Sequence, residues 1–584
     1  MTDPERASDR ARTITVAVAV TCAALALWLP SDWYTSLPRN PGYPQRQIEG
    51  TTVLRLTFAV QSAILLVIAA TGWKPPESPV GLSTGWRRES QETTAATRSA
   101  PIAVVLVITL FGLALRLTNL DADLWLDEIA TVATYAARPL AEVYGSYLSP
   151  GNHLLNSLLL KLSVFTFGES EWSVRLPAAL LGVATIPALY WVARMAMTET
   201  AAAGAAMILS VSYHHIFFSQ NARGYSGFLL FTLLSTGFLA SALRRDRAWK
   251  WAAYAFCATL GFAALMITAF VVIAHAIVAA FALGSLRRRG VWVGALGMRL
   301  ILTFAAAGFL SFQIYAVALP DVVAIYPTVY STRGSGYAPL SLEFLRELLR
   351  GLSEGFQRGV VAVPFVALAA VGFLVLLRRH WVIASSFALA LAATVGFLIW
   401  RGQSIAPRFL LPGLLLAILS VMATIDSAAA VVARRRRLSR RMELRLVAGT
   451  AAVLAGASLL ALPSYYAAPK QPYRAALNYI DGPLSGADPV IVVYPATGGF
   501  QYYLRKAKVR DSSRFRFVQS PAGLDSALAA QPDGRSVLVT TLFRALRAES
   551  SDLADLIERD WIPVAVFRGT LGDGDIRIWR QRDG

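Results

Sequence analysis

The sequence has 584 residues, of which 55% are apolar and 16% are charged, whereas a soluble domain carries about 25% charged residues. This composition excludes an ordinary soluble protein. The net charge of +19 does not indicate nucleic-acid binding, because the basic residues lie mostly in short loops between apolar segments, where they act as topology signals. Cys22 and Cys257, the two cysteines, lie in apolar segments and indicate no disulfide framework or metal cluster.

Apolar segments long enough to cross about 30 Å of hydrocarbon recur from residue 13 to residue 462. The first follows Arg6, Arg10 and Arg12. We interpret it as a transmembrane helix and not a signal peptide, because a second span follows and no clean cleavage site is present. About thirteen helices are predicted, at 13–29, 53–70, 101–118, 172–194, 201–218, 225–243, 249–263, 264–283, 299–319, 359–377, 381–400, 408–425 and 443–462. One long tilted helix over 249–283 is the alternative to two, and it would invert the topology downstream.

The arginine-rich loops predict which side of the membrane each segment faces. With the N-terminus in the cytoplasm, the loops at 244–245, 287–289, 378–379 and 434–441 all fall on the cytoplasmic side. The loops 119–171, 219–224, 320–358 and 401–407 then face outward, as does the tail after residue 463, and we expect the protein in the cell membrane. Residues 153–167 form an apolar stretch that is too short for a span and suits an interfacial or re-entrant helix.

The composition becomes that of a soluble domain after residue 463. Residues 489–495 and 536–541 are typical of buried strands, and residues 524–530 and 551–559 of helices. No phosphate-binding loop follows the first strand, because residues 496–499 lack the spacing and the lysine of a P-loop. The predicted fold class is therefore a polytopic α-helical membrane protein with a small extracytoplasmic α/β domain. Residues 1–100 hold two helices and a cytoplasmic linker, 101–462 the main transmembrane domain, and 463–584 the α/β domain.

An acidic cluster lies where the chain leaves the membrane after the third span, and it contains Asp121, Asp123, Asp127 and Glu128. Paired carboxylates at a membrane surface are candidates for a general base and its partner. The alternative is a solvated loop or the first turn of a helix that begins near Ile129, because acidic residues favour first turns through the helix dipole.

Three basic side chains lie in the other outward segments. Arg223 joins two apolar helices, and Arg408 opens a span bracketed by two prolines. A guanidinium can bind two phosphate oxygens at once, and a helix N-terminus also favours anions. His153 is a candidate phosphate or metal ligand at the outer interface. The alternatives are snorkelling arginines and a histidine that only packs. His214 and His215 are interpreted as structural.

Taken together, these segments resemble the GT-C membrane glycosyltransferases of the dolichyl-phosphate-mannose protein mannosyltransferase type, with their bacterial relatives that transfer aminoarabinose to lipid A. The matching stretches are LWLDE (124–128), FGESEWSVRLPAALLG (167–182), SQNARGY (219–225) and PRFLLP (407–412). Their order and their predicted membrane side both match. The resemblance is good over about 101–425, fair for the first two helices and loose for the tail.

The resemblance implies a set of site residues. The Asp-Glu pair of the first outer loop bears the catalytic acid in such enzymes, so the catalytic role carries over to Asp127, with Glu128 beside it. The carrier phosphate would be held by residues of the other outward segments: Arg223, Arg408, His153 and Tyr225. Many relatives have a second acidic residue near the segment matching 219–225, whereas Asn221, Tyr225 and Ser226 are neutral. No cofactor is indicated with certainty, and a divalent metal ion stays an open alternative.

The expected function is transfer of a sugar from a polyprenyl-phosphate-linked donor to an extracytoplasmic acceptor. Outside the cell there are no nucleotide sugars, so the donor must arrive attached to a lipid, and cations would stabilise its leaving phosphate. The expected partners are this donor, a protein, lipid or glycan acceptor, and membrane lipids, without nucleic acid. Two alternatives stay open: a flippase or transporter of polyprenyl-linked glycans, and a ligase or polymerase that uses diphosphate carriers. The sugar and the acceptor are not identified by the sequence.

Overall fold

The computed structural model describes residues 3–30, 43–72, 95–136, 138–147, 151–329, 337–354, 359–486, 489–507, 511–529 and 536–582. The predicted cytoplasmic linker falls mostly in 73–94, outside these residues. Within the described ranges, nine helices are long and apolar enough to cross a membrane, or up to ten if one bent pair forms a single span. The prediction of a multi-pass α-helical membrane protein is confirmed.

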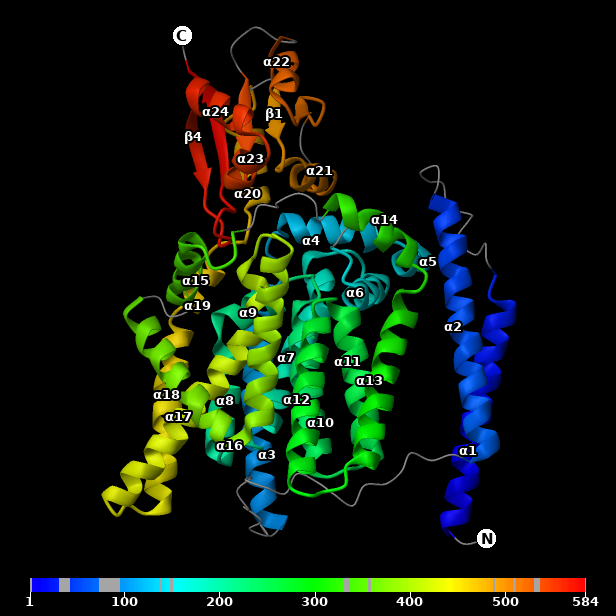
Figure 1. Ribbon diagram of the computed structural model, residues 1–584. Coiled ribbons are helices and arrows are strands. Elements are labelled where there is room, and N and C mark those ends of the chain that lie inside the picture. The colour runs from blue at the N-terminus through cyan, green and yellow to red at the C-terminus, as the bar shows by residue number, and fades with distance from the viewer. Residues whose placement is uncertain are drawn as a thin grey trace.

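The helices form an upright bundle with shorter helices across one end (Figure 1). In chain order they are α1 (Asp3–Trp28), α2 (Tyr43–Thr71), α3 (Ala95–Leu117), α4 (Leu126–Thr131), η1 (Val132–Ala136), α5 (Leu140–Gly145), α6 (Leu154–Phe167), α7 (Glu171–Ala193), α8 (Glu199–Val211), α9 (Tyr213–Ser219), α10 (Tyr225–Arg244), α11 (Ala248–Ala264), α12 (Thr268–Arg288), α13 (Gly294–Tyr315), α14 (Leu319–Val329), α15 (Leu342–Glu354), α16 (Gly359–Trp400), η2 (Pro407–Leu410), α17 (Pro412–Arg435), α18 (Arg440–Leu459) and α19 (Leu462–Tyr466).

Two predicted helices differ in detail from the structure. The helix predicted over 201–218 is broken at Ser212, whose backbone is extended and whose hydroxyl caps α9, and α8 and α9 meet at 59°. The region 249–283 holds two helices, α11 and α12, separated at 265–267. A straight α16 would be about 63 Å long, roughly twice the hydrocarbon thickness. Its non-helical residue His380 (φ −153°, ψ 69°) divides it near the boundary predicted between 377 and 381.

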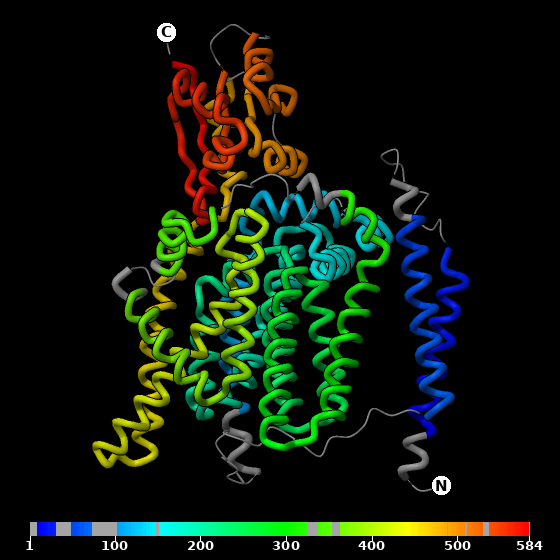
Figure 2. Tube along the Cα trace, viewed as in Figure 1, coloured from blue at the N-terminus to red at the C-terminus, as the bar shows by residue number. Residues whose placement is uncertain are grey.

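The two ends of the bundle differ in composition. At one end α4, α6 and α14 lie across the tops of the long helices, below the C-terminal domain (Figure 1). Figure 1 places the start of α1 at the opposite end, and the trace in Figure 2 places the α12–α13 and α17–α18 connections there as well. Those connections carry the arginines at 287–289, 434–437 and 440–441. The basic loops and the C-terminal domain therefore lie at opposite ends of the molecule.

The C-terminal domain contains a five-stranded mixed sheet of order β2-β1-β3-β5-β4. Its members are α20 (Tyr473–Asp481), β1 (Val490–Val493), α21 (Thr497–Lys506), β2 (Phe515–Val518), α22 (Pro521–Ala529), β3 (Val537–Thr540), α23 (Phe543–Glu549), α24 (Ser551–Asp560), β4 (Trp561–Phe567) and β5 (Ile576–Gln581). β1 pairs in parallel with β2 and β3, and β5 pairs antiparallel with β3 and β4. The sequence predicted β1, β3, α22 and α24 and missed β2, β4 and β5.

Strand β1 is buried on both faces of the sheet, and its alternate residues point to opposite sides. Ile491 and Val493 pack with α22, α23 and α24. Val490 and Val492 pack with α20 and α21, and this second core continues into the helical part through Leu124. The same core also includes Ile129, Val132, Ala136, Leu160, Val174 and Ala222. The C-terminal domain and the loop before α4 therefore share one hydrophobic core.

Candidate active site

The acidic loop is anchored by Glu128, which occupies the third position of α4. Its Oε2 accepts the Trp125 N–H at 3.2 Å, and its Oε1 accepts the Ala222 N–H at 2.8 Å. Both bonds satisfy backbone donors in a buried region, where an unpaired N–H is costly. Glu128 therefore ties the start of α4 to the turn between α9 and α10.

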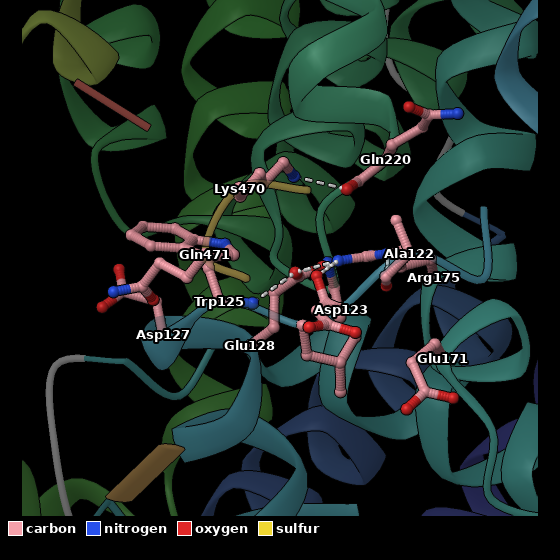
Figure 3. Close-up of polar contacts among 12 residues, drawn as sticks. Ala122, Asp123, Trp125, Asp127, Glu128, Glu171, Arg175, Gln220, Lys470 and Gln471 are labelled. Atoms are coloured by element: carbon pink, nitrogen blue, oxygen red, sulfur yellow. Dashed lines mark hydrogen bonds and ion pairs between the residues drawn. The ribbon is translucent and has the colours of Figure 1, made fainter. Parts of the chain in front are cut away.

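Glu128 is also the buried counter-ion of Arg175 from α7 (Figure 3). Arg175 Nε donates to Glu128 Oε1 at 2.8 Å and Nη2 donates to Oε2 at 2.6 Å, and the two residues are 0% and 2% exposed. The remaining guanidinium protons reach the carbonyl oxygens of Leu120, Ala122 and Asp123. Burial raises the pKa of Glu128, but the charges of Arg175 and Lys470 and the hydrogen bonds outweigh it, so this pKa lies below its usual range.

Asp127 lies beside Glu128 in sequence but in a different environment. Its side chain is 31% exposed, and its Oδ2 lies 3.6 Å from Nη1 of Arg223. That separation is an ion-pair contact and is longer than a normal hydrogen bond. Of these two adjacent acidic residues, Asp127 is accessible to solvent and Glu128 is fully buried.

Arg223 projects from the turn between α9 and α10. Its Nη1 lies 3.4 Å from the backbone oxygen of Asp127 as well as near the carboxylate. Its Nε is buried and has no hydrogen-bond partner among the described residues. The guanidinium therefore keeps donor capacity that an additional anion can use.

His153 lies immediately before α6 and contacts the same turn. Its Nδ1 accepts the Gly224 N–H at 2.7 Å, and its ring packs edge-on against Tyr225 with centroids 5.5 Å apart. Burial, followed by the charges of Arg223 and Arg408, holds the pKa of His153 well below its ordinary value. The ring is therefore neutral, and because Nδ1 accepts a bond, its proton is on Nε2.

The turn requires glycine at position 224 for a packing reason. A Cβ atom built on Gly224 would lie 2.0 Å from the Ala264 carbonyl oxygen and 2.9 Å from the His153 Cβ. Only a residue without a side chain lets the start of α10 approach the end of α11 this closely. This close approach sets the position of Tyr225, which is 2% exposed.

Arg408 comes from η2, a single 3₁₀ turn. The expectation that Arg408 opens the following span is wrong, because α17 begins at Pro412. The preceding Ile405 pairs with Tyr337 in an isolated antiparallel bridge, which fixes the approach to η2. Tyr225 and Asp127 raise the pKa of Arg408 against the opposing effect of burial. The structure therefore brings Asp127, Arg223, His153, Tyr225 and Arg408 into one electrostatic neighbourhood.

The residues of this neighbourhood do not fit a divalent metal ion. In the described part of the chain, no three His, Cys, Asp or Glu side chains lie together in a way that could hold one. The accessible carboxylate of Asp127 lies close to the cation of Arg223, and a hard divalent ion needs several oxygen ligands. Asn221 is buried, and neither atom of its amide has a hydrogen-bond partner among the described residues.

The sequence missed a group of residues that contact the acidic loop. Arg175 was within the quoted segment 167–182, and a charge inside an apolar span is itself a functional signal. The others come from the C-terminal domain: Gln471, Arg474 and Tyr503 contact this loop, and Lys470 contacts the carbonyl oxygens of Phe217 and Gln220. Tyr503 Oη accepts the Leu124 N–H at 2.7 Å, and Arg474 forms ion pairs with Asp123 and Glu171. No local sequence pattern predicts these contacts of the C-terminal domain, which join residues 250 or more positions apart.

Comparisons with known proteins give one family match and several structural matches. Residues 153–315 match a family model described as dolichyl-phosphate-mannose-protein mannosyltransferase. No curated protein sequence matches the chain. The crystal structure of ArnT from Cupriavidus metallidurans in the apo state is 14% identical with a TM-score of 0.50, and the match covers 83% of this chain and 98% of ArnT. ArnT bound to undecaprenyl phosphate matches at 13% identity and a TM-score of 0.47, with coverage of 83% and 98%.

A further match is the archaeal oligosaccharyltransferase AglB from Archaeoglobus fulgidus, in complex with an inhibitory peptide and a dolichol-phosphate. It is 11% identical with a TM-score of 0.49, and the match covers 84% of this chain and 75% of AglB. The likeness to apo ArnT shows a common fold over most of both chains. Residues 153–315 are thus similar to the mannosyltransferase family, and the chain as a whole shares the fold of apo ArnT.

Proposed function

We propose that the protein transfers a sugar from a polyprenyl-phosphate-linked donor to an extracytoplasmic acceptor, with inversion at the anomeric carbon. One observation carries the proposal: an accessible carboxylate, Asp127, lies 3.6 Å from the guanidinium of Arg223, with the cation of Arg408 close enough to interact with it. A base beside phosphate-binding cations is what attack on a phosphate-linked sugar needs. The family that residues 153–315 match is named for a dolichyl-phosphate-linked donor, which supports this class of carrier.

Asp127 acts as the general base in this proposal. The acceptor hydroxyl attacks the anomeric carbon and gives its proton to Asp127, a new bond forms to the acceptor oxygen, and the bond to the phosphate oxygen breaks. Arg223 and Arg408 stabilise the negative charge that the phosphate gains. Before the donor binds, Asp127 is the counter-ion of Arg223. The donor phosphate replaces it there, and the carboxylate becomes free to accept a proton.

The remaining predicted residues support these groups. Neutral His153 offers its Nε2 proton to the phosphate or to a sugar hydroxyl, and Tyr225 fixes its ring by edge-to-face packing. Glu128 is assigned a positioning role and not a catalytic one, because it is fully buried and bonded to Arg175 and to two backbone N–H groups.

The site is assigned to the outer face of the cell membrane. The basic connections lie at the end of the bundle opposite the C-terminal domain (Figure 2). Arginine-rich short loops favour the cytoplasm. The N-terminus is then cytoplasmic, and residues 463–584 form the extracytoplasmic domain.

The test is the lipid content of a strain that lacks the protein. Deletion should cause a polyprenyl monophosphate sugar to accumulate and one class of glycoconjugate to disappear, as measured by mass spectrometry. The wild-type gene should restore the product, and the Asp127→Asn variant should not. Accumulation of a polyprenyl diphosphate glycan would contradict the proposal and favour a ligase, polymerase or flippase.

A further inference from the structure

Two consecutive residues of the C-terminal domain contact the two segments that carry Asp127 and Arg223. The first, Lys470, is 4% exposed, and its ammonium donates to the Gln220 carbonyl at 2.5 Å and the Phe217 carbonyl at 3.2 Å. It also lies 4.5 Å from the centre of the Phe217 ring. The last carbonyls of a helix lack intrahelical partners. Lys470 therefore caps the end of α9, three residues before Arg223, and Figure 3 shows its bond to Gln220.

The second residue, Gln471, is fully buried and contacts the other segment. Its Oε1 accepts the N–H of Leu126, the first residue of α4, at 2.7 Å. That N–H has no intrahelical partner at a helix start, and the next residue is Asp127. The Gln471 amide nitrogen donates to the Thr541 hydroxyl at 3.0 Å, directly after β3. Gln471 therefore connects the catalytic loop to the sheet.

The backbone of this pair is held by the connection between β4 and β5. The Thr570 N–H donates to the Pro469 carbonyl at 3.0 Å, and the Leu571 N–H lies 3.3 Å from the Lys470 carbonyl. A Cβ atom on Gly569 would lie 2.3 Å from the Lys470 carbonyl oxygen, and one on Gly574 would lie 2.5 Å from it. Those two positions need glycine so that the connection can close around Lys470.

We propose that Lys470 and Gln471 are positioning residues that fix the spacing between Asp127 and Arg223, which makes the C-terminal domain part of the transfer machinery. The assignment of Asp127 and Arg223 rests on the proposed function. Lys470 holds the segment that ends in the phosphate-binding arginine, and Gln471 holds the segment that begins the catalytic helix. Among the described contacts, the hydrogen bonds of these two side chains go to the Phe217 and Gln220 carbonyls, the Leu126 N–H and the Thr541 hydroxyl, so each acts on the ion pair through the backbone.

The two residues should therefore affect different steps. Loss of the Lys470 ammonium should displace Arg223 and weaken the use of the donor, whereas loss of the Gln471 acceptor should displace Asp127 and slow the chemical step. A displacement of about 1 Å from a remote substitution can reduce the rate about a hundredfold. We expect Lys470→Met to raise the donor KM about 10- to 100-fold, and Gln471→Leu to lower kcat by a similar factor.

The experiment uses the full-length protein in lipid vesicles, with two measurements on each variant. The first is the kinetics of sugar transfer from a polyprenyl monophosphate donor. The second is hydrogen exchange of the backbone amides in residues 124–128 and 217–223, which requires no activity. Gln471→Leu should raise exchange at Leu126, and Lys470→Met should raise it in 217–223. Gln471→Glu keeps the acceptor oxygen and should restore both the exchange protection and most of kcat.

The matched control is Lys506→Met, which also removes a lysine at the domain boundary. Lys506 forms ion pairs with Glu169 and Glu171 and is partly exposed, so its loss should leave KM, kcat and exchange in both segments unchanged. Unchanged exchange in Lys470→Met and Gln471→Leu, or the same effect from Lys506→Met, would overturn the positioning role. An inactive wild-type protein combined with raised exchange in the two variants would instead refute the proposed function and support the positioning contacts.

Discussion

Replacing Arg175 with methionine should destabilise the protein strongly, because it leaves a buried carboxylate without its counter-ion. The Glu128–Arg175 contact is 2.6 Å long, and the two side chains are 0% and 3% exposed. Breaking a buried pair by removing one partner costs about 3–5 kcal/mol. In the variant, Glu128 would keep only its bonds from the Trp125 and Ala222 N–H groups. A loss of this size is a large fraction of a typical folding free energy of about 5–15 kcal/mol.

The assay is thermal unfolding of the purified full-length protein in detergent, followed by the loss of the monodisperse species. Arg175→Met should lower the midpoint by several degrees. The double variant Arg175→Met with Glu128→Leu should recover part of that loss, because replacing both members of a buried ion pair with apolar groups is often close to neutral. An unchanged midpoint for the single variant, or a double variant less stable than the single one, would refute the account of this pair.

Three further predictions follow from the charges and the topology. Arg408→Lys should keep the fold but weaken the use of the donor about ten- to a hundredfold, because a lysine cannot bind two phosphate oxygens at once. Wild-type kinetics in that variant and in Arg408→Ala would exclude a phosphate-binding role. Burial lowers the pKa of Lys470 to about 7, and its protonated form makes the stronger hydrogen bonds, so transfer should fall as the pH rises through 7. Lys470→Arg should remain charged and lose that alkaline decline, and identical pH profiles would contradict the explanation. Ser526→Cys should react with an impermeant thiol reagent in intact cells and Ser439→Cys should not; the reverse pattern would invert the topology.

The long helices could be predicted from the sequence for physical reasons, whereas the choice of Asp127 also depended on the resemblance to a family and stays a prediction. Apolar segments of membrane-crossing length identify helices without knowledge of their neighbours. Sequence alone did not separate the roles of Asp127 and Glu128, because adjacent acids look alike until burial is known: one is 31% exposed and the other is fully enclosed by Arg175 and backbone N–H groups.

The strands that sequence analysis missed also have local causes. β4 lies at the edge of the sheet and most of its residues are not buried. It contains Pro563, which normally argues against a strand and is tolerated at an edge. β5 is partly buried and follows a tight connection around residues 568–575. The contact between this connection and Lys470 could not be inferred either, because it joins residues about 100 positions apart in the chain.

In the proposed reaction Asp127 accepts the proton of the acceptor hydroxyl, a step that typically contributes about 10² to 10⁴ in rate. The most direct measurement is sugar transfer by Asp127→Asn in vesicles, alongside binding of the polyprenyl phosphate to the same preparation. The variant should express and bind the lipid normally but should not transfer the sugar, whereas Asp121→Asn should be nearly as active as the wild type. More than about a tenth of wild-type activity in Asp127→Asn would contradict the account, because a required general base cannot be replaced by an amide.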